Sequence, residues 1–346
     1  MGNQHEVLKP QPLLGSDGII VEPGYAGKLV WEYNKRQAKT GFMRLKEWDY
    51  YLVSSKKYAA AFTISDMSYI GLISVSLLDF EAKRDFTKTM LKLLPRGKMG
   101  LPETSETGDV HVSGKDYKLD YLISEGQRRI ACEIDSFLDE KPFSCDISLE
   151  DLKTDSICIA SAWKEKPTCF YLNQKVNCMR AKGSARLGGE EFIFNPDVDF
   201  GTLDWGRGVW TYDNTWYWGT GSGLIDGKPF GFNLGYGFSD RSCASENMLF
   251  YNRKSSKLDE VSFYIPVSSA GELDYMGRWT IKSSDGRFEA VLKPIMDRKA
   301  YIGAGPILSD QHQVFGLMDG ECALDGGEKL AIQDFLCAIE HVRNKY

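Results

Sequence analysis

The sequence predicts an all-β protein made of two antiparallel barrels in tandem, with helix as a small minority. Apolar residues alternate with polar ones through most of the chain, and glycine, aspartate and asparagine turns separate the alternating stretches. This pattern is typical of a sandwich or of closed barrels. One small barrel needs fewer residues than the 346 of this chain. We therefore expect two barrels.

The alternation locates hairpins in order along the chain. Residues 117–123 and 130–134 alternate on either side of a polar turn, which predicts a hairpin. A second hairpin is expected across the glycine pair at 188–189, and a third connects 279–281 to 288–292. These segments together indicate a chain dominated by short-range antiparallel pairing.

Four other segments have patterns of their own. Residues 261–265 place three apolar side chains on one face of a strand. We expect at most a short helix at 80–94, and 330–339 fits neither the helical nor the strand period. The glycine-rich run at 219–227 is interpreted as strand and turn rather than as a dinucleotide loop, because no helix follows it.

Two domains are predicted, an N-terminal barrel at 1–189 and a C-terminal barrel at 190–346. Turn residues near 195–197 give the linker chemistry expected at such a break. An internal echo also favours two halves, because 48–66 and 216–233 each begin with tryptophan and end in a carboxylate or an amide. The alternative is chance similarity between β-hairpins.

Composition excludes several function classes. A net charge of −6 argues against nucleic acid or an anionic membrane surface as the main partner. No segment approaches 18 uninterrupted apolar residues, so no integral membrane segment is predicted. The N-terminus lacks the apolar core of a signal peptide, and Glu6 argues against lipidation of Gly2. A cytoplasmic location is therefore expected.

The eight cysteines form no C-x-x-C pair and are predicted to be reduced thiols, with no metal site. The four histidines are scattered along the chain. Motifs for a serine hydrolase elbow, a phosphate-binding loop and a zinc protease are missing from the sequence. We therefore expect chemistry that needs no cofactor.

The stretch DWGRGVWTYDNTWYW, residues 204–218, combines charge with six aromatic rings. So many rings on an outer face would expose a large apolar patch, so some of them are expected to line a cavity. Asp204 and Arg207 would lie on opposite faces of a regular strand, but a bulge at Gly206 and Gly208 would bring them to one side. The structural alternative is an Arg207–carboxylate pair that only pins a barrel wall.

Several blocks of the chain resemble an uncharacterised family, domain-of-unknown-function 2804. They are KEWDYYLVSS and FTISDMSYIG in the first half, the run 169–223 with DWGRGVW and WYW, and later GFNLGYGFSDRSCASENMLFYN, KLDEVSFYI, LKPIMDR, HQVFG and AIEH. The resemblance covers nearly the whole chain. It departs at 238–241, where the family has a glycine-rich step, and after the final acidic block.

That family is similar to a wider lipocalin-like group with carotenoid hydratases, AttH-type proteins, tocopherol cyclase and some cycloaddition enzymes. The resemblance implies two calycin-type barrels in tandem. It supplies no reaction, because function on a shared fold lies in the site. The relatives suggest protonation of an alkene in a dry, aromatic-lined pocket, without a cofactor or metal.

Under this interpretation Asp204 or Glu246 is the acid, and Arg207 fixes a carboxylate of the ligand or of the protein. The expected ligand-binding side chains are Trp205, Trp210, Trp216, Trp218, Asn247, Arg298, His312 and Glu340. A solvent-facing position on alternating strands is the simpler alternative for the isolated charges among them.

Three function classes stay open. The first is a lyase or hydratase, isomerase or cyclase on an isoprenoid or lipid-like substrate. The second is a non-catalytic carrier of an apolar or amphipathic ligand, and the third is a carbohydrate-active or glycan-binding protein. A closed aromatic pocket with one acid favours the first, and at most one buried carboxylate favours the second. Two carboxylates facing each other across an open cleft favour the third.

Overall fold

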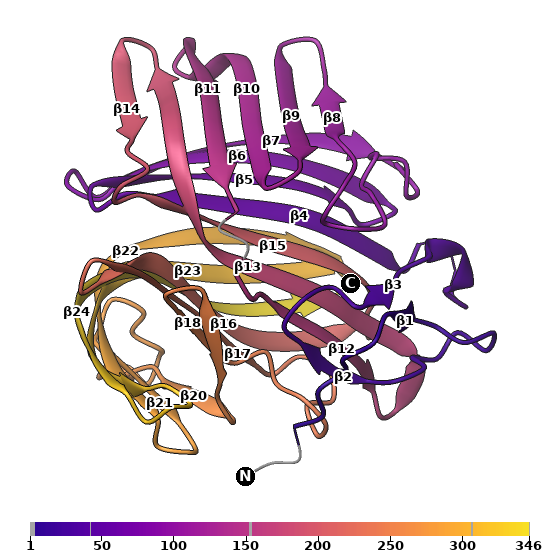
Figure 1. Cartoon of the computed structure of the whole chain (residues 1–346). Coiled ribbons are helices and arrows are strands. Elements are labelled where there is room, and N and C mark those ends of the chain that lie inside the picture. The colour runs from indigo at the N-terminus through magenta and orange to yellow at the C-terminus, as the bar shows by residue number, and fades with distance from the viewer. Residues whose placement is uncertain (1–3, 42, 152–153, 306, 346) are drawn as a thin grey trace.

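The computed structural model describes residues 4–41, 43–151, 154–305 and 307–345 (Figure 1). Two large antiparallel sheets make up most of this part of the chain, and each sheet curls on itself. Helical structure among the described residues is limited to one 3₁₀ turn, η1 (Lys35–Gln37). The prediction of an all-β fold is therefore confirmed. In the same residues no helix combines the length and apolarity needed to cross a membrane.

The first sheet has thirteen strands, and its main path runs β7-β6-β5-β4-β15-β13-β11-β10-β9-β8. Off this path, β12 and β14 pair with β13, and β2 pairs with β12. Its strands are β2 (Gly24–Ala26), β4 (Leu45–Ser54), β5 (Tyr58–Asp66), β6 (Ile70–Asp79), β7 (Arg84–Leu93), β8 (Val110–Ser113), β9 (Tyr117–Ser124), β10 (Gln127–Leu138), β11 (Lys141–Glu150), β12 (Ile157–Trp163), β13 (Lys166–Leu187), β14 (Glu190–Phe194) and β15 (Phe200–Val209). A separate parallel pair joins β1 (Gln11–Pro12) to β3 (Trp31–Glu32).

The second sheet has nine strands in the order β19-β18-β17-β16-β24-β23-β22-β21-β20. Its strands are β16 (Asp213–Ile225), β17 (Lys228–Tyr236), β18 (Met248–Tyr251), β19 (Lys254–Lys257), β20 (Val261–Tyr264), β21 (Trp279–Ser283), β22 (Phe288–Ala304), β23 (Ile307–Ala323) and β24 (Lys329–Lys345). The three predicted hairpins are present as β9–β10, β13–β14 and β21–β22.

Two sequence expectations are corrected by the strands. Residues 84–93 form strand β7 rather than a short helix, because cross-strand pairing with β6 satisfies their backbone groups. Residues 330–339 belong to the long strand β24, which pairs on both sides with β16 and β23. An intermediate pattern of apolar residues thus reflects a strand that packs against other elements on both of its faces.

Sheet membership changes between β15 and β16. The strands β14 and β15 belong to the first sheet, so the second sheet begins at Asp213, beyond residue 190 where we predicted the second domain to begin. The turn residues at 195–197 connect β14 to β15 inside the first sheet. There the side chain of Asn195 accepts a hydrogen bond from the backbone of Asp197.

The two sheets repeat one strand arrangement. In the first, the meander β4–β7 is joined through β4 to the late strand β15, which pairs with β13. In the second, the meander β16–β19 is joined through β16 to the late strand β24, which pairs with β23. This repeat supports the duplication suggested by the tryptophan-led segments at 48–66 and 216–233.

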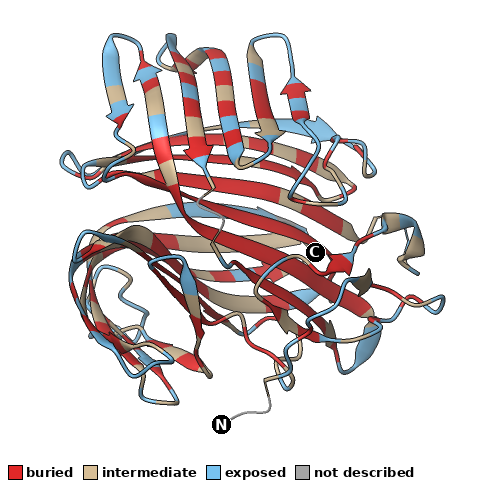
Figure 2. Cartoon of the chain, viewed as in Figure 1, coloured by how far each residue is buried: buried red, intermediate tan, exposed pale blue. Residues whose placement is uncertain are grey.

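The two sheets pack face to face around β15, which is buried along its whole length (Figure 2). Each sheet has its own apolar core, and a third core lies between them. This third core includes Leu52 of β4 and Phe80 of the β6–β7 turn, packed with Trp218 and Phe315 of the second sheet. Each fully buried large side chain contributes roughly 1.5–3 kcal/mol, so the interface is a permanent part of the fold.

A bulge in β13 also joins the sheets. Its register with β15 shifts between Val176 and Met179, and Cys178 has a positive φ of 61°. The side chain of Asn177 turns toward the second sheet, where its amide donates to Thr220 Oγ1 at 2.9 Å and to the carbonyl of Phe232 at 3.2 Å. The bulge thereby fixes the position of β13 against β16 and β17.

Candidate functional site

A cluster of buried polar groups lies between the two sheets. Its first carboxylate is Asp204 of β15, whose side chain is 13% exposed. Oδ1 accepts hydrogen bonds from Asn173 Nδ2 at 2.7 Å and from Trp48 Nε1 at 3.1 Å, and Oδ2 lies 2.5 Å from Lys175 Nζ. Two neutral donors and one ammonium stabilise the ionised carboxylate.

Gly206 gives Trp48 the space to reach this carboxylate. A Cβ at position 206 would lie 2.0 Å from the Trp48 ring. Trp48 is the residue opposite Gly206 in the β4–β15 ladder. The glycine therefore serves close approach of a ring and not the predicted bulge.

The second carboxylate is Glu340 of β24. Its Oε1 accepts from Trp216 Nε1 at 3.0 Å, and its Oε2 accepts from Gln311 Nε2 at 3.0 Å and from Gln313 Nε2 at 3.2 Å. All three donors are neutral. Burial is the main reason that the pKa of Glu340 is raised above its ordinary value.

The two carboxylates occupy equivalent positions in the two sheets. Asp204 stands opposite Lys175 on one side and Tyr50 on the other. Glu340 stands in the same way between Gln313 and Trp218.

The tryptophans that donate to the two carboxylates also occupy equivalent ladder positions. Trp48 stands opposite Gly206, two residues after Asp204, and Trp216 stands opposite Val342, two residues after Glu340. We name these two groups the first clamp (Trp48, Asn173, Lys175 and Asp204) and the second clamp (Trp216, Gln311, Gln313 and Glu340).

The clamps also interlock across the interface. The ammonium of Lys175, from the first clamp, lies 4.5 Å from the ring centre of Trp218. In the reciprocal contact, Gln313 Nε2 of the second clamp lies 3.4 Å from the hydroxyl of Tyr50. Burial raises the pKa of that hydroxyl to about 12, which keeps it neutral.

A third carboxylate enters from the loop between β17 and β18. Glu246 Oε2 accepts from Asn233 Nδ2 at 3.2 Å and lies 3.9 Å from Lys175 Nζ. Among the described residues, no donor lies within hydrogen-bond distance of Oε1. Burial raises the pKa of Glu246, while Lys175 acts in the opposite direction and Asp204 adds to the rise.

Two neighbours fix the backbone around Glu246. Lys257 Nζ donates to Ser245 Oγ at 2.9 Å and to the carbonyl of Asn247 at 3.0 Å, on either side of the glutamate. A Cβ at Gly235 would lie 2.4 Å from Glu246 Oε1, so only glycine at 235 leaves room for the carboxyl. The lysine and the glycine together determine where the carboxyl of Glu246 lies.

Aromatic rings pack beside the carboxylates. Phe238, in the same loop as Glu246, lies 4.9 Å from both Tyr171 and Trp210 and 5.4 Å from Trp216, measured between ring centres. Trp48 packs edge-on against Trp210 at 5.3 Å. We name these five rings the aromatic cluster. Two of them, Trp48 and Trp216, also donate to Asp204 and Glu340.

The sequence matches the family described as Domain of unknown function (DUF2804) over residues 4–346. The chain belongs to this family. No curated protein sequence matches it.

Three solved structures are similar to this DUF2804 chain. Kievitone hydratase from Nectria haematococca has 13% identity over 98% of this chain and 97% of that chain, with a TM-score of 0.55. An AttH-like protein from Nitrosomonas europaea has 14% identity over 90% and 96%, with a TM-score of 0.51. CghA has 10% identity over 97% of both chains, with a TM-score of 0.56. At these identities the likeness shows the fold, two lipocalin-like barrels in tandem.

The structure does not bring Arg207 to Asp204. Strand β15 pairs in regular register through Gly206 and Gly208, so residues three apart face opposite sides, and the predicted bulge is wrong. The Arg207 side chain is fully buried on the other face. There Nη1 donates to Asp49 Oδ1 at 2.9 Å, and Nη2 donates to the carbonyl of Pro102 at 2.8 Å.

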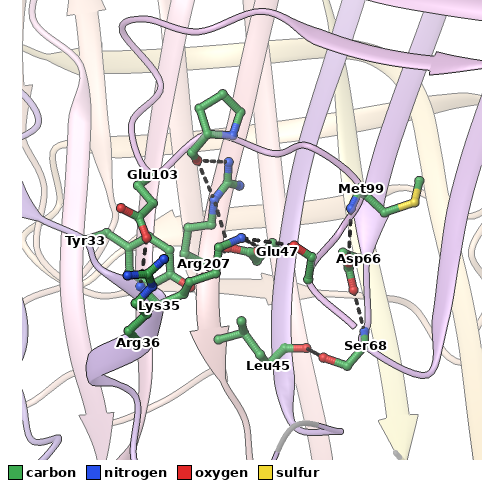
Figure 3. A network of polar contacts seen from close by, with 12 residues as sticks. Tyr33, Lys35, Arg36, Leu45, Glu47, Asp66, Ser68, Met99, Glu103 and Arg207 are labelled. Carbon is green, nitrogen blue, oxygen red and sulfur yellow. Dashed lines mark hydrogen bonds and ion pairs between the residues drawn. The ribbon is translucent and has the colours of Figure 1, made fainter. Parts of the chain in front are cut away.

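Figure 3 shows Arg207 beside Glu47, which also accepts hydrogen bonds from Tyr33 and Lys35. Trp205 lies on the same side, with its ring centre 4.3 Å from the Arg207 guanidinium. These residues belong to the core of the first sheet. The geometry matches the structural alternative, in which Arg207 pairs with carboxylates and pins the barrel wall.

The other expected ligand-binding residues divide between the interface and other regions. Arg298 crosses the interface and donates to Ser76 Oγ of the first sheet at 2.9 Å. Asn247 Oδ1 accepts from the backbone of Gly235 at 2.7 Å, which makes it part of the scaffold. His312 adjoins Gln313 on a strand and so faces the opposite side, where its Nδ1 lies 2.7 Å from Asp297 Oδ2.

Sequence reasoning missed three of the four residues of the first clamp, Trp48, Asn173 and Lys175. The run Asn173-Gln174-Lys175 places three buried polar residues directly after the apolar residues 169–172 of β13, and this was the available signal. Gln311 and Gln313 gave a weaker signal, since glutamine on a strand more often faces solvent.

The eight cysteines are free, as predicted. Burial raises the pKa of several of these thiols, including Cys158 and Cys337. Within the described ranges, no group of three or more histidine, cysteine, aspartate or glutamate side chains is arranged to hold a metal ion.

Proposed function

We propose that the protein is an enzyme that needs no cofactor and acts on an apolar or amphipathic, lipid-like small molecule between its two sheets. The reaction would be that of a hydratase or lyase, an isomerase or a cyclase. One observation carries this proposal: the carboxyls of Glu246 and Asp204 flank one ammonium, that of Lys175, beside the aromatic cluster, and burial raises the pKa of Glu246.

Glu246 is proposed as the general acid. A carboxyl whose pKa is raised holds its proton at a higher pH than an ordinary carboxyl, and it can deliver that proton to an alkene or a carbonyl. Its Oε2 is engaged by Asn233, which leaves Oε1 as the oxygen from which a proton can be given. Asp204 then serves as the ionised partner that accepts a proton or stabilises positive charge.

The aromatic cluster is proposed to surround the reacting part of the substrate. Ring faces stabilise positive charge by about 0.5–2 kcal/mol each when water is excluded. Two indole N–H groups are already engaged by carboxylates, so those rings are held in fixed orientations. The name of one relative, kievitone hydratase, fits addition of water as the reaction class.

Extraction and mass spectrometry of whatever co-purifies with the protein would identify the ligand class. The compound found, or a close analogue, is then tested with wild-type protein and with Asp204→Asn and Glu246→Gln. We expect turnover per folded molecule to fall by a factor of at least 100 in both variants. Glu191→Gln, in an exposed pair with Arg186, is the matched control and should leave turnover unchanged.

Other outcomes point to the other two classes. Retention of an apolar ligand without turnover by the wild-type protein would contradict an enzyme and identify a carrier. A co-purifying sugar, hydrolysed only when both Asp204 and Glu246 are intact, would identify a carbohydrate-active protein instead.

A further inference from the structure

We infer that the second clamp is a proton-bearing counterpart of the first, with Glu340 protonated under conditions in which Asp204 is ionised. The inference deepens the proposed function by adding a second acid to the same site. It depends on one difference between the clamps: the residue opposite the carboxylate is Lys175 in the first and Gln313 in the second.

The two clamps can be compared directly because their other hydrogen-bond donors match. Each carboxylate accepts from one tryptophan indole, at 3.1 Å in the first clamp and 3.0 Å in the second. Each also accepts from one side-chain amide, Asn173 in the first clamp and Gln311 in the second. Each amide stands opposite the residue two positions after the carboxylate. Asn173 is opposite Gly206, and Gln311 is opposite Val342.

The two clamps differ in their third donor, which is Lys175 in the first and Gln313 in the second. An ammonium 2.5 Å from Asp204 balances the negative charge, whereas the amide of Gln313 leaves a charge on Glu340 unbalanced. Glu340 is 7% exposed, so its ionised form would be costly without a counter-charge.

Charged and titratable groups of three other strands act on Glu340. Arg298 of β22 favours the ionised form, but its guanidinium donates to Ser76. The described residues include no ion pair between Arg298 and Glu340. Asp204 of β15 opposes ionisation, and Tyr50 of β4 is neutral. The raised pKa of Glu340 agrees in direction with this balance.

The consequence is a site that can give one proton and take another. In an isomerisation, Glu340 would transfer its proton to one substrate atom while Asp204 removes a proton from another. The substrate then gains and loses one proton and no other atom. Return of a proton from Asp204 to Glu340 restores the starting state. A hydration balances in the same way, with Glu340 protonating an alkene carbon while Asp204 takes a proton from the attacking water.

The two tryptophans report on the two carboxylates separately, without any substrate. The chain has 8 tryptophans, so a ¹⁵N-correlated spectrum of the indole N–H groups holds few signals. Trp48→Phe and Trp216→Phe assign the two that matter. Each N–H chemical shift should change when the carboxylate that accepts its hydrogen bond is protonated.

We expect the Trp216 signal to titrate at a higher pH than the Trp48 signal. Gln313→Lys should lower the Trp216 midpoint by about 1–3 pH units, because it supplies the missing ammonium. Lys175→Gln should raise the Trp48 midpoint. Glu340→Gln is the control, which should abolish the Trp216 titration and leave that of Trp48. This control and the wild-type comparison decide the question even if Gln313→Lys does not fold.

A Trp216 midpoint at or below that of Trp48 would overturn the inference, as would a Trp216 midpoint that does not move in folded Gln313→Lys. The proposed function fails by a different measurement. If Asp204→Asn and Glu246→Gln leave turnover unchanged while the indole signals titrate as expected, the clamps carry different protons but serve another purpose.

Discussion

Lys175, on a strand of the first sheet, holds its ammonium 4.5 Å from the ring of Trp218 in the second. The same ammonium pairs with Asp204 at 2.5 Å. The Lys175 ammonium therefore takes part in a cation–π contact and in an ion pair at the same time. Lys175 thus links the candidate site to the packing of the two sheets, and its replacement should affect both the site and the stability of the fold.

Replacement of Lys175 by methionine should destabilise the protein by about 3–5 kcal/mol, because it leaves a buried carboxylate without its counter-charge. Gln313→Met, at the equivalent place in the second clamp, should cost only about 1–2 kcal/mol, since it removes neutral hydrogen bonds. Urea denaturation measures both. Equal losses would contradict the assignment of different charges to the two clamps.

Replacement of Arg207 by methionine should also destabilise the fold by about 3–5 kcal/mol, because Asp49 and the nearby Glu47 lose their buried partner. Ligand binding per folded molecule should be retained, since Arg207 faces away from Asp204. Arg186→Met removes an exposed pair and should cost at most about 1 kcal/mol. A stable Arg207→Met protein that has lost its ligand would restore the ligand-binding role expected from the sequence.

The sequence was sufficient for the fold because the evidence for strands is local. Alternation and turn residues determine hairpins such as β9–β10 without reference to distant parts of the chain. The segment 84–93 was missed for the opposite reason. Its edge position leaves both faces largely exposed, so composition carried no clear period.

The site was only partly predictable because its members come from distant strands. Asp204 and Trp216 could be recognised from an unusual local density of charge and indole. Lys175 and Glu340 meet this stretch only through β-ladders that join residues far apart in the sequence. The bulge that does occur, at Val176–Met179, lies where the sequence shows no glycine, so the sequence could not locate it.

Cys243 should report on the loop that carries Phe238 and Glu246. It is the cysteine with intermediate exposure, and the other seven are buried. We expect one thiol to react with a disulfide reagent in the native protein, and none in Cys243→Ser on the same timescale. A ligand bound between the sheets should slow this reaction by ordering the loop. Several native thiols reacting together would contradict the burial described here.

The remaining prediction concerns stability and pH. Glu246 and Glu340 have folded-state pKa values above the ordinary 4.5, mainly because they are buried. Such groups hold more protons in the folded than in the unfolded state between the two values. Their contribution to stability is therefore fully present below pH 4.5 and declines as pH rises through the folded-state pKa.

Comparison of the wild-type protein with the double variant Glu246→Gln and Glu340→Gln isolates this contribution. Neutral amides cannot ionise, so we expect the stability of the wild-type protein relative to the variant to fall from pH 4 to pH 8, by about 1.4 kcal/mol for each unit of pKa elevation. Glu191 has a lowered pKa beside Arg186, so Glu191→Gln should give a difference of the opposite sign. Urea midpoints across this pH range measure both. A relative stability that rises with pH in the double-variant comparison would contradict the raised pKa values and remove the support they give to either carboxyl as the acid.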